Sequence, residues 1–184
     1  MSRTTIRVMR PDEFVAVRDV SIAAFKGDPR IGSLLDILRA SWSWEDALSF
    51  VAVRDDSIIG HVLYSHALLD APTSIVEVLV LSPLAVRPDL QRQGIGSRLV
   101  FESIAALAAR HEPLVFLEGH PDYYQRFGFR PAASFGFTAP SVRIPPAAFM
   151  VHPLPAYEPW MTGALVYPDA FWRTDTVGLR ADNT

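Results

Sequence analysis

An apolar strand that runs into a glycine-punctuated turn and then into a helix is the strongest constraint on this fold. Residues 84–99 read Leu-Ala-Val-Arg-Pro-Asp-Leu-Gln-Arg-Gln-Gly-Ile-Gly-Ser-Arg-Leu. The first N–H groups of a helix have no partner within it, and the helix dipole adds positive charge there. Gly94 and Gly96 carry no side chain that would block a ligand. This glycine-rich turn, residues 91–97, therefore predicts a phosphate site.

Residue identity separates the phosphate-binding motifs that could produce such a turn. A Walker-type loop needs a Gly-Lys-Ser/Thr sequence, but the only lysine of the chain is Lys26. A dinucleotide-binding turn needs a third small residue, and Leu99 stands in that place. Glu118 lies near the distance at which such a motif carries its acidic residue, so an NAD site stays open as an alternative.

Two segments resemble motifs of the GCN5-related N-acetyltransferase (GNAT) superfamily. Gln91-x-x-Gly94-x-Gly96 matches its Gln/Arg-x-x-Gly-x-Gly/Ala signature, and residues 119–129 contain a Tyr-x-x-x-Gly-Phe element that begins at Tyr124. Two matched motifs in the expected order are hard to obtain by chance. Further similarity to one bacterial branch of predicted N-acetyltransferases lies in residues 81–86, 148–150 and 163–171. The resemblance thus covers nearly the whole chain.

The expected fold is a single α/β (α+β) domain spanning residues 1–184. Helices are expected at 11–25, 31–41 and 94–110, and strands at 4–9, 48–54, 58–69, 74–86 and 114–117. They predict a central mixed, mostly antiparallel sheet with helices on both faces. The GNAT resemblance adds that the middle strands splay apart after Pro83 to admit a pantetheine arm.

The resemblance also implies acetyl-CoA as cosubstrate and assigns the residues that bind it. The backbone at the end of the splayed strand is expected to pair with the pantetheine amides, at Leu84, Ala85 and Val86. The glycine-rich turn is expected to hold the pyrophosphate through Gln91, Arg92, Gln93, Gly94, Ile95, Gly96 and Ser97. In the family the first two helices border the site of the acceptor.

Acetyl transfer from a thioester requires a base, an oxyanion donor and an acid. Tyr124 matches the family tyrosine near the cofactor sulfur, so it is assigned as general acid, although a core aromatic role stays open. A strand N–H near Leu84 is the expected oxyanion donor. Glu77 is the expected base, with desolvation raising its pKa. Three alternatives remain: His120, a water chain, or a purely structural Glu77.

Composition narrows the function classes. The net charge of −3 argues against nucleic-acid or anionic-membrane partners, and no apolar run has the length of a signal peptide or membrane span. We therefore expect a cytoplasmic protein. The absence of cysteine excludes a cysteine acyl-enzyme, which leaves direct attack in a ternary complex. The five histidines show no metal-ligand spacing, so no metal is expected.

The expected function is acetyl or acyl transfer from acetyl-CoA to an amine of a small molecule or peptide. A non-catalytic acyl-CoA binding or sensing module would need the same turn, and an NAD-dependent oxidoreductase is the third alternative. The acceptor amine is not specified by any motif. The apolar C-terminal third either forms a homodimer contact or closes the monomer core, through Phe149, Trp160, Phe171 and Trp172.

Overall fold

The computed structural model describes residues 3–178 of the chain. These residues group into two compact units. Unit 1 contains the described residues up to Ser65 together with Leu81–Ala109, and unit 2 contains His66–Val80 together with the described residues from Arg110 onward. Two long strands, β3 (Ser57–Asp70) and β4 (Ile75–Val86), contribute residues to both units. The expectation of one domain over residues 1–184 remains a prediction.

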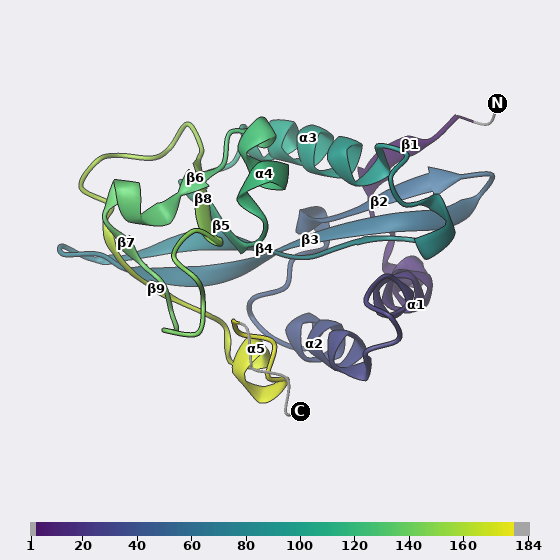
Figure 1. The fold of residues 1–184 in the computed structure, drawn as a ribbon, viewed down its shortest axis with the longest axis horizontal. Coiled ribbons are helices and arrows are strands. Elements are labelled where there is room, and N and C mark those ends of the chain that lie inside the picture. The colour runs from purple at the N-terminus through teal and green to yellow at the C-terminus, as the bar shows by residue number, and fades with distance from the viewer. Residues whose placement is uncertain (1–2, 179–184) are drawn as a thin grey trace. The chain divides into compact units, whose positions relative to one another are not determined.

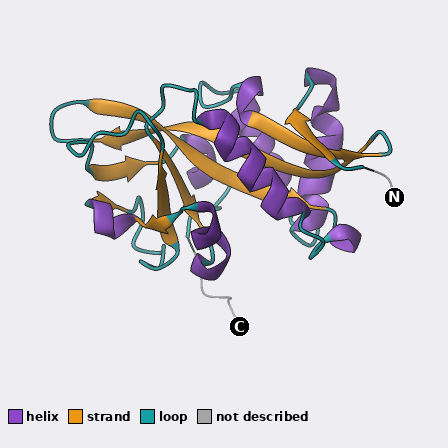
Figure 2. Cartoon of the chain, turned by 90° about the horizontal axis from the view of Figure 1, so that it is seen from above, coloured by secondary structure: helices purple, strands orange, loops and turns teal. Residues whose placement is uncertain are grey.

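Unit 1 is a sheet with helices on both faces. Strand β2 (Ser49–Arg54) pairs antiparallel with β1 (Thr5–Val8) on one edge and with β3 on the other. Helix α3 (Ile95–Leu107) contacts β1 and β2, whereas α1 (Phe14–Ala24) and α2 (Pro29–Arg39) contact each other. Figure 1 shows α3 on one side of these strands and α1 and α2 on the other, and Figure 2 looks onto the α3 side.

Helix α2 illustrates why these segments form where the pattern predicts them. Asp28 is its N-cap and accepts a hydrogen bond from the amide of Arg30 at 2.9 Å, and Pro29 occupies the first turn, where its missing N–H is harmless. The helix buries one apolar stripe, formed by Ile31, Leu34, Leu35 and Leu38. Burial of each such side chain stabilises the fold by about 1.5–3 kcal/mol.

A hydrogen-bonded histidine lies in the core of unit 1. The His61 ring is buried, with Nε2 2.9 Å from Ser49 Oγ and Nδ1 3.3 Å from Ser21 Oγ. Burial lowers the pKa of His61 to about 3, so the ring is neutral at physiological pH. Both ring nitrogens have hydroxyl partners, which makes His61 a structural residue of the core.

Unit 2 contains the strands that follow α3. The N-terminal half of β4 pairs in parallel with β5 (Leu114–Glu118), which pairs antiparallel with β8 (Phe149–Pro153), and β8 also pairs with β6 (Arg130–Pro131). The end of β3 pairs with β9 (Gly163–Val166), and β9 pairs in parallel with β7 (Phe137–Thr138). Two short helices, α4 (Pro121–Tyr124) and α5 (Asp169–Arg173), complete the unit.

The observed pairing confirms a mixed, mostly antiparallel sheet. The ladder between β4 and β5 consists of Leu79 with Val115 and Val80 with Phe116. This parallel ladder stops well before the end of β4, and a splay of these two strands would produce such an early stop. Strand β4 continues through Pro83, whose peptide bond with Ser82 is cis. The short elements β6, β7 and α5 were not expected from periodicity.

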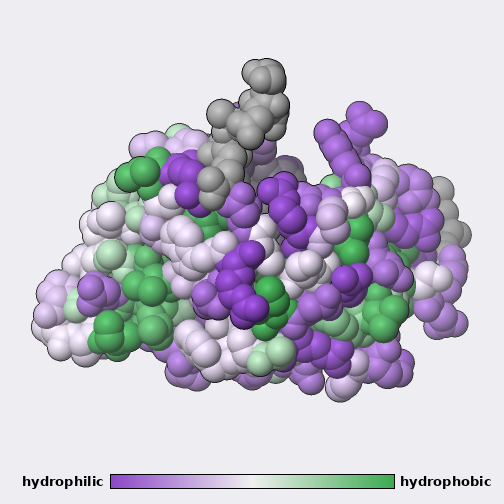
Figure 3. All heavy atoms as spheres, turned by 90° about the horizontal axis from the view of Figure 1, so that it is seen from below, coloured by the Kyte–Doolittle hydropathy of each residue, from purple (hydrophilic) through white to green (hydrophobic). Residues whose placement is uncertain are grey.

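The aromatic residues of the C-terminal third divide between core and surface. Phe149 and Phe171 are buried, whereas Trp160 and Trp172 are about two-fifths exposed, at 39% and 42%. On the face shown in Figure 3, hydrophobic residues are interspersed with hydrophilic ones. Neither the exposure of these tryptophans nor this face shows a partner chain, so the expected homodimer contact stays a prediction. None of the helices within residues 3–178 is both long and apolar enough to cross a membrane.

Candidate active site

The glycine-rich turn presents a row of backbone amides that have no acceptor within residues 3–178. A short 3-10 helix, Pro88–Leu90, ends at Gln91, and α3 begins at Ile95. The first amide with a helical acceptor is that of Arg98, which donates to the carbonyl oxygen of Gly94 at 3.0 Å. Among the described residues, none accepts a hydrogen bond from the amides of residues 92–97. These N–H groups and the α3 dipole suit an anionic ligand.

Two residues of this turn have a left-handed backbone conformation. Arg92 has φ 61° and Gly94 has φ 81°, and this conformation costs a non-glycine residue about 1–2 kcal/mol. A strained residue beside a row of free amides is typical of an anion-binding turn. A Cβ at Gly94 would meet no other atom within 4 Å, so glycine is required there for its backbone conformation rather than for space within the protein.

The polar side chains before the turn are partly engaged with the protein itself. Gln91 Nε2 donates to the carbonyl oxygen of Val86 at 3.1 Å, which links the turn to the end of β4. Arg87 forms a bidentate pair with Asp89 at 3.0 and 2.5 Å. Among the described residues, Arg92 makes no ion pair, and its side chain is exposed. Arg92 is therefore the side chain of the turn best placed to meet a solvent-borne phosphate.

The end of β4 leads directly into this turn. Ala85 is buried, whereas Leu84 and Val86 are half-buried. The ladder with β5 ends at Val80 and includes none of residues 84–86. Gly60 on β3 lies close to this segment, since a Cβ there would approach the Ala85 carbonyl oxygen to 3.1 Å. The absence of a side chain at Gly60 allows this close packing.

Tyr124 lies at the end of α4 in unit 2, among other aromatic rings. Its ring packs edge-on against Tyr123, Phe127 and Phe129, with centroids 4.9, 6.5 and 5.7 Å away. A Cβ at Gly119 would overlap the Tyr124 ring, so the absence of a side chain there permits this ring position. Within residues 3–178, the phenol oxygen has no hydrogen-bond partner.

The Tyr124 phenol is a proton donor at physiological pH. Burial, with a smaller contribution from Tyr123, raises the pKa of Tyr124 well above its ordinary value of 10. The phenol therefore stays protonated across the physiological range. A free, protonated hydroxyl can donate a proton to an anionic leaving group.

Glu77 lies on β4 in unit 2, and its surroundings differ from those expected of a desolvated base. Its side chain is 47% exposed, and its Oε1 lies 3.0 Å from His66 Nδ1 on β3. The expected desolvation of this carboxylate is therefore wrong, because Glu77 lies on the water-facing side of its strand. The position is occupied by a strand carboxylate with a histidine partner, and the structural role that the sequence analysis left open for Glu77 stays open.

His120 is exposed and precedes α4. Its carbonyl oxygen accepts the amides of Tyr123 and Tyr124 at 3.0 and 3.2 Å, whereas its side chain makes no capping hydrogen bond. The backbone of His120 thus orders the turn that carries Tyr124. Its imidazole is available to solvent.

Two further carboxylates make contacts that the sequence did not predict: the half-buried Glu118, considered there only for an NAD site, and the buried Glu112. Glu118 accepts the amide of Gly178 at 2.9 Å and the hydroxyl of Tyr167, and burial raises the pKa of Glu118. Glu112 is fully buried and pairs with Arg110. Apart from Arg110, the partners of these two residues, which are His66 for Glu112 and Tyr167 and Gly178 for Glu118, lie far away in the sequence, so spacing could not predict these contacts.

Comparison with known proteins identifies the fold. The model of the acetyltransferase (GNAT) domain family matches residues 5–132, which is more than half of the chain. The chain belongs to the GNAT acetyltransferase family. An uncharacterized N-acetyltransferase of Escherichia coli (strain K12), YjhQ, is 34% identical over 151 residues, which cover 80% of this chain and 82% of YjhQ. This GNAT protein is therefore an acyltransferase.

Two solved GNAT structures are similar to this protein over nearly the whole length of its chain. The GNAT family N-acetyltransferase YhbS of Escherichia coli, in complex with CoA, has a TM-score of 0.82 at 28% identity and covers 94% of both chains. A GNAT family acetyltransferase of Brucella melitensis, in complex with acetyl-CoA, has a TM-score of 0.73 at 29% identity, covering 92% of this chain and 98% of its own. Both ligands contain the pyrophosphate that the glycine-rich turn is expected to bind.

The dinucleotide interpretation is wrong. The family match assigns the fold to the acetyltransferases, and β4 follows three earlier strands, β1 to β3, whereas the corresponding Rossmann strand opens its domain. Glu118, the acidic residue on which that interpretation depended, is already engaged with Tyr167 and Gly178.

Proposed function

We propose that this GNAT acetyltransferase transfers the acetyl group of acetyl-CoA to an amine by direct attack within a ternary complex. The observation that carries the proposal is the row of unpaired amides of residues 92–97 at the start of α3. A diphosphate is the ligand that such a row stabilises best, and coenzyme A contains one. The CoA and acetyl-CoA complexes of the two related structures support this choice.

The proposed binding mode assigns each part of the cosubstrate to a segment of unit 1. The amides of the glycine-rich turn would bind the pyrophosphate, with Arg92 adding a charged donor. The backbone at Leu84, Ala85 and Val86 would pair with the pantetheine amides. Gln91 would act indirectly, since its side chain already supports the turn through Val86.

The proposed chemistry needs no enzyme-bound intermediate. The amine nitrogen forms a bond to the thioester carbonyl carbon, a backbone N–H near Leu84 stabilises the oxyanion, and the C–S bond then breaks. The departing thiolate takes a proton from the Tyr124 phenol, and the nitrogen loses a proton to a base. Free CoA and the acetylated amine are the products.

Glu77 remains the proposed base, with His66 at 3.0 Å as its partner. An exposed carboxylate can accept the proton of an ammonium through water, which the sequence-based hypothesis also allowed. Glu77→Gln removes the proton acceptor and keeps the shape, so turnover should fall about 10²-fold or more with unchanged acetyl-CoA affinity. Unchanged turnover would transfer the role to His120 or to a water chain, and a pH–rate profile of His120→Gln then separates these two.

Ligand binding and turnover test the proposal in two steps. Acetyl-CoA at about a hundred times its Kd should stabilise the protein by about 2.7 kcal/mol in a thermal shift assay, whereas NAD should have no effect. Release of free CoA is then measured with a panel of small amines and peptides. Stabilisation by NAD alone would contradict the proposal.

A non-catalytic acyl-CoA module is the second candidate. The exposure of Glu77 favours it, because the catalytic carboxylate expected from the sequence would be shielded from water. Tight acetyl-CoA binding without CoA release on any amine of the panel would select this alternative.

A further inference from the structure

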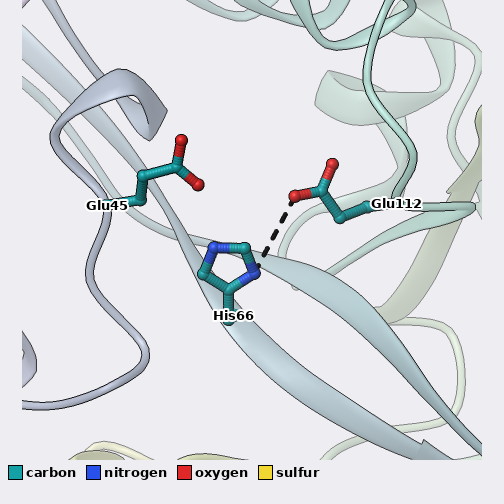
Figure 4. A group of neighbouring side chains, drawn as sticks. All are labelled: Glu45, His66 and Glu112. Atoms are coloured by element: carbon teal, nitrogen blue, oxygen red, sulfur yellow. Dashed lines mark ion pairs between the residues drawn. The ribbon is translucent and has the colours of Figure 1, made fainter.

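Two histidines and two glutamates gather in unit 2. His66 lies on β3, Glu77 on β4, and His111 and Glu112 on the segment between α3 and β5. His66 Nδ1 is 3.0 Å from Glu77 Oε1 and 3.9 Å from Glu112 Oε1, and Figure 4 shows His66 and Glu112 facing each other. His111 Nδ1 lies 3.9 Å from Glu112 Oε2.

Glu112 is the fixed negative charge of this cluster. It is fully buried, and Arg110 donates to its two oxygens, from Nε at 2.9 Å and from Nη2 at 2.6 Å. Burial would raise the pKa of Glu112, but the hydrogen bonds from Arg110 and from its own backbone, with the nearby charges, outweigh it and lower that pKa. The two carboxylate oxygens offer four lone pairs, so the two hydrogen bonds from Arg110 and the one from the backbone leave one for another ligand.

We propose that His66, Glu77, His111 and Glu112 form a binding site for a divalent transition metal, of which Zn²⁺ fits best. Two ligands of a tetrahedral zinc ion are roughly 3.4 Å apart. The separations of 3.0 and 3.9 Å around His66 bracket that value, and ligand atoms of Glu77, His111 and Glu112 all lie within 4.8 Å of one another. Glu77, His111 and Glu112 are therefore close enough to share one ion, and a shift of the His66 ring, which already approaches both glutamates, would supply the fourth ligand.

The types of ligand atom in this cluster favour one metal ion over others. Two imidazoles and two carboxylates suit Zn²⁺, whereas Ca²⁺ and Mg²⁺ prefer oxygen ligands alone. Arg110 holds Glu112 as outer partners commonly hold a ligating carboxylate. Glu77 and His111 are 47% and 77% exposed, so an ion reaches the cluster directly from solvent.

Metal binding would join three segments that are distant in sequence. The ion would cross-link β3, β4 and the connection before β5, and so stabilise unit 2. It would also engage Glu77 as a ligand, so base catalysis by Glu77 and metal binding exclude each other. The inference does not depend on the transfer reaction, because metal binding is measured without acetyl-CoA.

Calorimetry with metal-free, tag-free full-length protein tests the site. Zn²⁺ should bind with a stoichiometry of one per chain, and at about a hundredfold excess over Kd it should raise Tm by about 5–10 °C. Co²⁺ should give the visible absorption of a tetrahedral site with nitrogen and oxygen ligands. No Zn²⁺ binding, or an octahedral Co²⁺ spectrum, overturns the proposal.

Matched variants separate this site from adventitious histidine binding. His111→Gln is an exposed change that keeps the fold, and it should weaken Zn²⁺ binding at least tenfold, as should His66→Gln. His120→Gln changes another exposed histidine of unit 2 outside the cluster and should bind Zn²⁺ like the wild type. Equal affinity in all three variants means adventitious surface binding and rejects the site.

Discussion

Tyr124 shows how an aromatic cluster can prepare one hydroxyl for chemistry. The neighbouring rings and the absence of a side chain at Gly119 hold the Tyr124 ring, while its oxygen is left without a partner among the described residues. A phenylalanine would satisfy the packing equally well. We therefore propose that this tyrosine, whose hydroxyl makes no hydrogen bond to the described residues, has a role in proton transfer rather than in stability.

Tyr124→Phe tests this role. The change removes the proton donor and keeps the ring, so turnover should fall about 10²–10⁴-fold, while acetyl-CoA affinity and Tm barely change. Free CoA release and binding calorimetry measure the two quantities. Unchanged turnover would remove Tyr124 from the mechanism.

A second variant moves the phenol without removing it. Gly119→Ala places a Cβ against the Tyr124 ring, which must shift. Turnover should therefore fall although the hydroxyl is retained, and the near-ultraviolet circular dichroism of the tyrosines should change. Wild-type turnover in Gly119→Ala together with an inactive Tyr124→Phe would mean that the hydroxyl matters but its position does not.

At the scale of elements, the joint between β4 and α3 carries the cosubstrate hypothesis. Strand β4 continues beyond its ladder with β5 and leads into the glycine-rich turn. Helix α3 follows the turn, and its first amides have no acceptor among the described residues. The left-handed Gly94 is the N-cap of α3 and so stands at the start of the helix whose first amides line this turn. We propose that the binding property belongs to this joint, since neither the strand nor the helix alone would supply it.

Gly94→Ala and Gly27→Ala form a matched pair that tests the joint. Both glycines have a left-handed φ, 81° and 83°, and a Cβ at either meets nothing within 4 Å. Both variants should lose about 1 kcal/mol of stability. Only Gly94→Ala should also weaken acetyl-CoA binding, because its methyl group faces the incoming phosphate. Equal affinities in the two variants, by calorimetry, would contradict a phosphate site at the turn.

At the scale of the whole molecule, the buried His61 makes stability depend on pH. The unfolded chain protonates His61 near pH 6.5, whereas burial delays protonation of the folded chain to about pH 3. The unfolded state therefore binds more protons in this window, and the stability that the neutral ring provides above pH 6.5 is lost as pH falls towards 3.

His61→Gln removes this titration while keeping a neutral polar side chain. Between pH 6.5 and pH 5 the wild type should lose about 2 kcal/mol more stability than the variant. Urea unfolding at both pH values measures the difference, and each protein serves as its own reference at pH 6.5. Parallel losses in the two proteins would show that His61 does not control the pH dependence.

The sequence by itself determined the local structure and the family. Three signals act between near neighbours along the chain: helix caps such as Asp28, apolar periodicity and the Gln91-x-x-Gly94-x-Gly96 spacing. Such signals can be recognised from the sequence alone. Only the tertiary structure decided that Glu77 is exposed, that Glu118 meets Tyr167 and Gly178, and that His66 meets Glu112. Those contacts join residues on different strands and loops, and their burial and pKa depend on what the fold packs around them.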